Sequence, residues 1–193
     1  MKYLRRAAVF LAKKAVLYTL ILSLLIYAFF MAYHLSNAYI TVSEGLQARV
    51  SVTLTRTGSS ALSHYFTGSF IDNDPVLSAS KNGTDTYRYF DVSGFEYDVE
   101  ISSLRWRPLK NVSVEDTVTH EKTTYHGVVT CTAKESVSNI SGSLKREYAS
   151  AAEEIGSISH WDSGRYNVTL VRVDGDWLIV SMIQDKNFQD PNS

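Results

Sequence analysis

The longest apolar run lies near the N-terminus, where the nineteen residues from Ala15 to Tyr33 carry no charge. At a rise of about 1.5 Å per residue, a helix of this length spans roughly 28 Å, close to the thickness of the hydrocarbon core of a bilayer. The pattern therefore predicts one transmembrane helix at residues 15–35.

Positive charge lies on one side of this run. The first basic residue after it is Arg49, apart from a normally neutral His34, whereas five precede it: Lys2, Arg5, Arg6, Lys13 and Lys14. The positive-inside rule then predicts a chain in the cell membrane, with residues 1–14 cytoplasmic and the C-terminal domain extracytoplasmic. A cleaved signal peptide is the alternative, because Ser36 and Ala38 have small-x-small spacing, but the apolar run exceeds the usual core of such a peptide.

Helical spacing continues beyond the span. Residues 36–42 are expected to form a linker or stalk, and Leu46, Val50 and Leu54 then recur at intervals of four. A helix is favoured there over a strand. Ser43 followed by Glu44 is a plausible start, and the stretch can also continue the membrane helix as a stalk. A polar loop is expected after "DNDP", over residues 76–85.

A second helix is predicted over residues 60–71, "SALSHYFTGSFI". Ser60 can cap it, and Leu62, Phe66 and Phe70 form one stripe at i, i+4 and i+8. The stripe predicts that this helix buries one face.

Alternation with period two dominates after Asp85. Aromatic and β-branched residues predict strands at residues 86–92, 95–106, 112–122 and 123–135. Ser138 to Glu154 breaks the pattern and is compatible with a loop containing one helical turn or with a long bend between strands. A flexible tail is expected at residues 186–193.

The most regular stretch is Gly164 to Gln184, which predicts a hairpin with Asp174-Gly175 as a two-residue type I′ turn. In that register Arg172 faces Trp177 and is expected to form a cation–π pair with it. One face would carry Tyr166, Val168, Leu170, Arg172, Trp177, Ile179 and Ile183, and the other Thr169, Val171, Val173, Leu178, Val180 and Met182. Because both faces are substantially apolar, we expect both to be covered.

Two segments in this order, "YFTGSF…DNDP" at residues 65–75 and "GRYNVTLVRVDGDWLIVSMI" at residues 164–183, resemble the nuclear transport factor 2-like superfamily. The resemblance implies an α+β fold in which a strongly bent antiparallel sheet wraps on N-terminal helices as a cone, here over residues 43–185. Within that superfamily, the chain is similar to membrane-anchored bacterial members, including assembly components of conjugative, type IV-like secretion machines. This implies a scaffold in an envelope complex and transfers no individual functional residue.

Charge and cysteine content remove several classes of function. Nineteen Lys+Arg balance twenty Asp+Glu, so nothing favours nucleic acid as a partner. The single cysteine, Cys131, permits no disulfide within the chain and no cysteine-based zinc site, and it reads as a small apolar strand residue. No cofactor or metal is expected.

Candidate catalytic residues do not form a recognisable set. Enzymes of the superfamily use an Asp or an Asp–His pair inside the cone, for which the candidates are His64, His120, His126, His160, Asp91, Asp98 and Asp116. No spacing makes any pair converge. We therefore do not expect an enzyme.

Two groups of residues are candidates for binding. The basic and aromatic residues Arg105, Trp106 and Arg107, with Arg172 and Trp177, form a candidate interaction surface, although a packed tryptophan with solvated arginines is the simpler reading. The aromatic residues that could line the cone are Phe66, Phe70, Tyr89, Phe95 and Tyr97.

The resulting functional hypothesis is a single-pass, membrane-anchored, extracytoplasmic scaffold or protein-interaction module, with a protein partner or a second copy bound through the sheet. The alternatives are binding of a small molecule or peptide in the cone, and an isomerase- or cyclase-type enzyme, which needs a buried carboxylate in the mouth of the cone. The small-molecule ligand is unknown.

Overall fold

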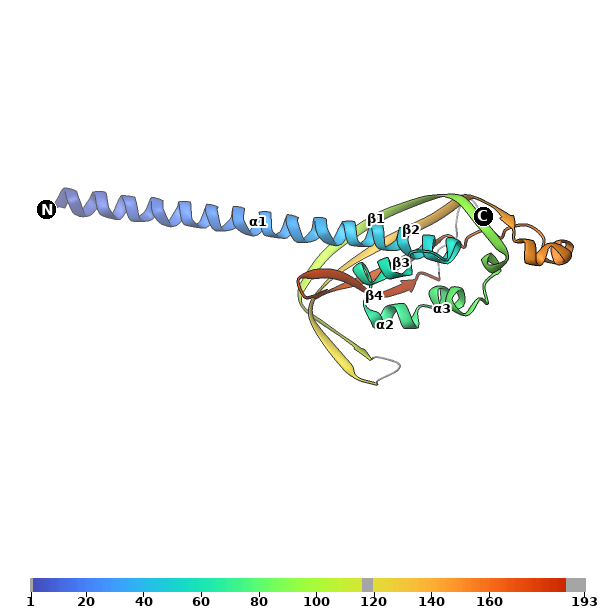
Figure 1. Ribbon diagram of the computed structural model, residues 1–193. Coiled ribbons are helices and arrows are strands. Elements are labelled where there is room, and N and C mark those ends of the chain that lie inside the picture. Colours follow the sequence, from blue (N-terminus) through green and yellow to red (C-terminus); the bar gives the residue numbers. More distant parts are fainter. Residues whose placement is uncertain (1, 116–119, 187–193) are drawn as a thin grey trace. The chain divides into compact units, whose positions relative to one another are not determined.

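The computed structural model describes residues 2–115 and 120–186, except for the side chains of residues 2–9, 11 and 12. The chain is α+β, with a long apolar N-terminal helix and a curved four-stranded antiparallel sheet (Figure 1). The helices are α1 (Lys2–Thr55), α2 (Gly68–Asn73), α3 (Pro75–Asn82) and α4 (Ala152–Ile155), with 3-10 helices η1 (Ser59–His64), η2 (Thr86–Tyr89) and η3 (Arg146–Ala151). The strands are β1 (Phe90–Glu115), β2 (Lys122–Leu144), β3 (Gly164–Val173) and β4 (Asp176–Gln184).

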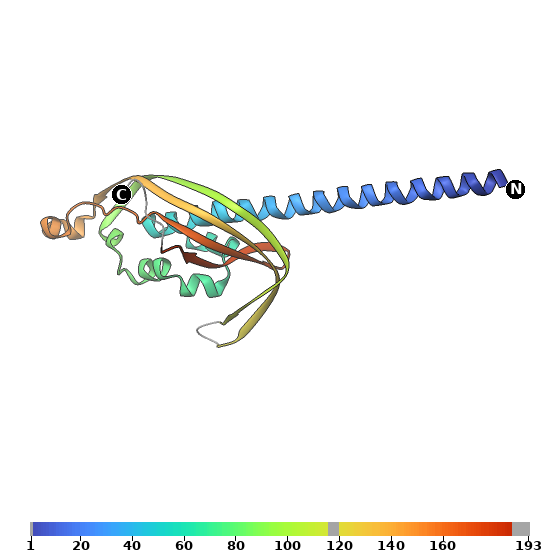
Figure 2. The ribbon, with the colours of Figure 1, turned by 180° about the vertical axis from the view of Figure 1, so that it is seen from behind.

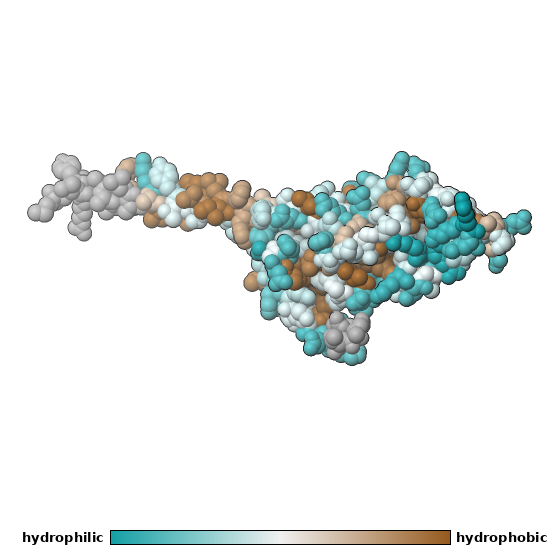
Figure 3. Space-filling model, viewed as in Figure 1, coloured by the Kyte–Doolittle hydropathy of each residue, from teal (hydrophilic) through white to brown (hydrophobic). Residues whose placement is uncertain are grey.

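The chain divides into two compact units, Met1–Ser36 and Asn37–Ser193, with the boundary inside α1. In the first unit, large apolar side chains are exposed along the helix, from 45% for Ile21 to 76% for Phe29. Figure 3 colours this stretch as strongly apolar. The helix is long and apolar enough to cross a membrane, a property that a signal sequence shares.

In the second unit, α1 buries one stripe. Ala38, Val42, Leu46, Val50 and Leu54 recur every four residues and are at most 1% exposed. The predicted helix is confirmed, and it continues the apolar helix as a stalk, so Ser43 lies within α1 and does not begin a separate helix. The expected linker at residues 36–42 is helical as well.

The predicted helix over residues 60–71 is broken in two. Leu62, Phe66 and Phe70 are all buried, as the stripe predicted, but the helical pattern is interrupted between η1 and α2, where Tyr65 lies in a turn and Phe66 forms a β-bridge. There the backbone pairs with β4: Ile179 donates to the Tyr65 carbonyl at 2.7 Å, and Thr67 donates to the Ile179 carbonyl at 3.0 Å. Pairing with a distant strand therefore replaces local helical bonds and covers part of the β4 edge.

The expected loop after "DNDP" is instead helix α3. Asp74 caps it by accepting from the Leu77 amide at 2.8 Å, and Pro75 occupies its first turn. Gly83 ends the helix in the left-handed conformation, with φ of 63°. The Asn82-Gly83 signal thus marked the end of a helix.

The sheet has the order β1-β2-β3-β4, and every neighbouring pair is antiparallel. The prediction of four separate strands over residues 86–135 is wrong. Residues 86–89 form η2, and the described parts of the other predicted strands belong to two long strands, β1 and β2. Ser138 to Leu144 completes β2, and η3 and α4 follow it. Figures 1 and 2 show β1 and β2 as long curved ribbons that bend sharply near one end.

A bulge makes this bend possible. Between Arg107 and Asn111 three residues of β1 lie opposite the single residue Gly127 of β2. Gly127 has φ of 72°, a conformation that glycine adopts without strain, and a Cβ there would meet the Pro108 carbonyl oxygen at 3.4 Å. Beyond the bend, residues 111–115 and 122–126 form a two-stranded arm.

The arm covers the turn end of the second face of the β3–β4 hairpin. Val128, Val171 and Val180 form a small core there, and Val112 and Tyr125 of the arm pack against it. The expected cover is therefore present on this part of the face, where the same chain supplies it, whereas Thr169 and Ile183 farther along line a cavity.

The hairpin register is confirmed at the turn, where Arg172 pairs with Trp177 across Asp174-Gly175, both with positive φ. Farther along, the predicted faces of Met182 and Ile183 are wrong. Leu170 pairs with Ile179 and Thr169 with Ser181, so a bulge at Val180 shifts the register. As a result Met182 pairs with Val168, and Ile183 lies 65% exposed.

Candidate functional site

A buried charged cluster lies between α1 and the inner face of the sheet. Arg49 of α1 meets Asp74 at the start of α3, with Nη2 at 3.1 Å from Oδ2, and Glu135 of β2, with Nη1 at 3.9 Å from Oε1. The three residues are at most 6% exposed. Trp161 donates from Nε1 to the same Glu135 oxygen at 2.9 Å.

Burial and neighbouring charges shift the pKa values of Arg49 and Glu135. Desolvation alone would lower the pKa of Arg49, but the charges of Asp74 and Glu135 outweigh it and raise that pKa. The pKa of Glu135 is raised by burial, against the opposing effects of Arg49 and the Trp161 hydrogen bond. Glu135 is therefore a buried carboxylate held by a cation.

The cluster is not open to either large cavity. The cavities of about 570 Å³ and about 530 Å³ are lined by other residues. Arg49 Nη1, Glu135 Oε2 and the Tyr97 hydroxyl have no hydrogen-bond partner among the described residues. Burial and the Glu135 charge raise the pKa of Tyr97, so its hydroxyl stays protonated. We therefore read the cluster as a link between α1, α3 and the sheet.

The second feature is a groove of about 530 Å³ on the outer face of the sheet. Its position depends on a bulge in β1, where Ser102 pairs with Thr132 and Arg105 with Thr130, although a regular strand would place residue 104 opposite Thr130. Ser103 takes φ of 55° in this bulge. The extra residue turns Arg105 and Arg107 outward and turns Trp106 to the side of the buried Val129.

Three cations line the groove: Arg105, Arg107 and Lys110. No Asp or Glu is among its lining residues, and within residues 2–115 and 120–186 none of the three cations forms an ion pair or a side-chain hydrogen bond. The remaining lining is mostly hydroxyl and amide side chains, with an apolar end: Ser103, Thr130, Cys131, Thr132, Asn167, Val168, Thr169 and Ile183.

The cavity of about 570 Å³ differs in charge from the groove. It lies beside α3, and Arg56, Asp72 and Lys81 are among its lining residues. Arg56 is already paired, with Nη2 at 2.6 Å from Asp85 Oδ2, and it also donates to the Ser80 carbonyl. The charge of Arg56 is thus largely neutralised within the chain.

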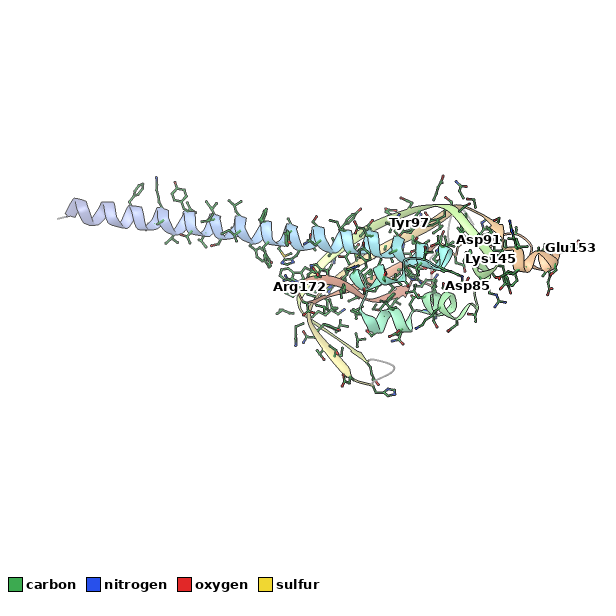
Figure 4. All side chains as sticks on the ribbon, in the orientation of Figure 1. Asp85, Asp91, Tyr97, Lys145, Glu153 and Arg172 are labelled. Carbon is green, nitrogen blue, oxygen red and sulfur yellow. The ribbon has the colours of Figure 1, made fainter. Side chains whose placement is uncertain are left out.

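The predicted interaction surface is only partly assembled. Arg105 and Arg107 meet in the groove, whereas Trp106 belongs to the opposite side of β1. Trp177 is 5% exposed in the core. Arg172 lies at the turn of the hairpin, at the other end of the domain from Asp91 and Lys145 (Figure 4), where its Nε donates to the Gly175 carbonyl at 3.1 Å.

The five aromatic residues predicted to line a cone cavity are dispersed. Phe66 and Phe70 stack on each other with centroids 4.8 Å apart. Phe95 and Tyr97 pack against the cluster that contains Val50, and Tyr89 meets the ring of Tyr148 edge-on at 4.9 Å. None of the five lines either of the two cavities.

The candidate catalytic residues lie apart on the surface. His64, His126, His160, Asp91 and Asp98 are exposed, and His126 Nδ1 contacts Asn111 Oδ1 at 3.0 Å. His120 lies 3.6 Å from Glu115. Asp116 is outside the described residues. Among the described residues, no three His, Cys, Asp or Glu side chains converge as a metal site.

Sequence reasoning missed Arg49, Asp74 and Glu135, although two carried a signal. Arg49 lies three residues after Leu46 on the apolar stripe of α1. Glu135 continues the alternating buried positions of β2 that include Val129 and Ala133. A charge at a core position of each element is the pattern that a buried ion pair produces.

Comparisons of the chain with protein-family models, with curated proteins and with solved structures found no match.

Proposed function

We propose that the chain is a single-pass, membrane-anchored protein-interaction module whose α+β unit lies outside the cytoplasm. The observation that carries this proposal is the presence, in one chain, of an apolar helix with exposed side chains and a separate folded unit with its own core. Basic residues before the apolar run support a cytoplasmic N-terminus.

Cysteine labelling in intact cells tests this topology. In a Cys131→Ser background, a membrane-impermeant maleimide is expected to label Ser159→Cys in intact cells and Lys13→Cys only after lysis. Both replaced side chains are exposed. Equal labelling of both, release of the chain by carbonate, or a mature chain that begins at Tyr39 would contradict a membrane anchor.

The fold is proposed to be a nuclear transport factor 2-like cone. The order of short helices followed by a curved antiparallel sheet supports it. An experimental structure in which β1 and β2 do not curve around α1–α3 would contradict it.

A role in a bacterial envelope assembly, of the conjugation or secretion type, belongs to the same proposal. Its support is the apolar helix joined to a separate folded unit, together with a polar outer face whose cations form no ion pair with residues 2–115 or 120–186. Crosslinking in native membranes is expected to recover a protein partner or a second copy, and recovery of neither would contradict the proposal.

A further inference from the structure

The groove on the outer sheet face combines positive charge with neutral polar groups. Arg105, Arg107 and Lys110 provide the charge, from β1 and its bulge. Thr130 and Asn167 belong to the rows of hydroxyl and amide groups on β2 and β3. The ladder hydrogen bonds already occupy the backbone of β2 between its neighbours, so a ligand here is recognised by side chains.

This chemistry distinguishes between anions. A phosphate group only accepts hydrogen bonds, whereas hydroxyl and amide side chains both donate and accept. A peptide backbone offers donors and acceptors, and arginine binds carboxylates through two parallel hydrogen bonds. The mixture of cations with Thr130, Thr132 and Asn167 therefore suits an acidic peptide better than an inorganic anion.

The dimensions agree with this ligand. Neighbouring strands lie about 4.8 Å apart, so crossing from β1 to β4 covers roughly 14 Å, the length of about four to five extended residues. One exposed apolar side chain of the lining, Ile183 at 65%, lies at the β4 end of the groove. It offers a contact to an apolar residue of the same segment.

We propose that this groove binds a short, extended acidic segment of a protein partner across strands β1 to β4. The inference rests on the proposed interaction function and names the chemistry of its partner. Electrostatic complementarity would give the contact its selectivity and its dependence on salt.

Fluorescence anisotropy on the full chain, in nanodiscs of zwitterionic lipid, tests the proposal. The probe is a labelled six-residue peptide of alternating glutamate and threonine, and its control has glutamine in place of glutamate. The acidic peptide is expected to bind, more weakly as salt rises, and the control peptide is not. Arg105→Gln/Arg107→Gln should weaken binding about tenfold or more.

A charge-matched double variant, Lys81→Gln/Arg146→Gln, removes two exposed cations elsewhere. It should change the affinity by no more than about twofold, because rim and distant charges contribute little at moderate salt. Circular dichroism checks that both variants are folded. Equal binding of the two peptides, equal loss in both double variants, or tight binding of triphosphate without binding of the acidic peptide would overturn the proposal. Release of the chain from membranes would contradict the anchor alone, because every residue that lines the groove lies between Ser103 and Ile183, outside the apolar segment.

Discussion

Arg49 on α1 and Asp74 at the start of α3 form a buried ion pair in which both Nη2 and Nε approach Asp74 Oδ2, at 3.1 and 3.2 Å. The other carboxylate oxygen, Oδ1, accepts from the Leu77 amide. One side chain therefore caps α3 and also ties that helix to α1. Glu135 extends the link to β2.

Removal of the cation should be costly. Arg49→Met would leave Asp74 and Glu135 buried without a positive charge, and breaking a buried pair in this way costs about 3–5 kcal/mol. We expect a loss of unfolding free energy of that size in urea titrations of the chain in mild detergent. Arg146→Met, at an exposed position, should change it by less than about 0.5 kcal/mol. Similar effects of the two substitutions would show that the cluster contributes little to stability.

Glu135 should make stability depend on pH. Because its pKa is raised in the folded chain, the proton binds more tightly there than in the unfolded chain. Its contribution to stability is therefore full below the ordinary pKa of 4.5 and is lost as the pH rises through the folded-state pKa. We expect the unfolding free energy of the wild type, relative to Glu135→Gln, to fall over that window.

Urea titrations at a series of pH values measure this difference. Glu153→Gln is the control, because Glu153, a residue of α4 that Figure 4 labels, is exposed. A wild-type-minus-variant difference that stays constant from acid to neutral pH would contradict the raised pKa of Glu135.

Gly45 should resist replacement by alanine even though it lies within a helix. An alanine Cβ at this position would lie 2.9 Å from the Tyr65 Cβ and 3.2 Å from the Ile179 Cδ1. Alanine gains about 1 kcal/mol in helix propensity, but overpacking costs about 1–3 kcal/mol. We expect a net loss of about 1 kcal/mol for Gly45→Ala in thermal unfolding. Gly68→Ala, where a Cβ meets no atom within 4 Å, should be neutral or stabilising.

At Ser103, in the bulge of β1, introducing a glycine is expected to raise stability. Ser103 takes φ of 55°, which costs a residue with a Cβ about 1–2 kcal/mol. Ser103→Gly should therefore stabilise the chain by about 0.5–1 kcal/mol, while Ser102→Gly, in regular strand conformation, should destabilise it. The measurement is the urea midpoint of each variant. Destabilisation by Ser103→Gly would mean that the serine side chain itself holds the bulge.

Local patterns predicted those features whose causes are local. Asp174-Gly175 adopts positive φ and sets the opposite pairing of Arg172 and Trp177, because a two-residue turn determines the register next to it. The stripe of α1 was equally readable, since helical spacing alone places Leu46 and Val50 on one buried face.

Features that depend on distant segments could not be read in the same way. The helix predicted over residues 60–71 breaks because Ile179, more than a hundred residues away, supplies backbone partners at Tyr65 and Thr67. The bulge at Val180 exchanges the faces of Met182 and Ile183, because one extra residue inverts a period of two. Helix α3, in place of the loop expected after "DNDP", is a different case because its signals are local: Asp74 accepts from the Leu77 amide, Pro75 lies in the first turn and Gly83 ends the helix.

By itself the sequence determined an apolar span without charge, the positions that α1 buries and the turn of the last hairpin, because each depends on neighbours within a few residues. Only the tertiary structure decided that Arg49, Asp74 and Glu135 meet. It also placed Arg105 and Arg107 in a groove and Trp106 on the opposite side of the strand. Both outcomes depend on strand register and on contacts between distant segments, whose free energies arise only when the whole chain packs.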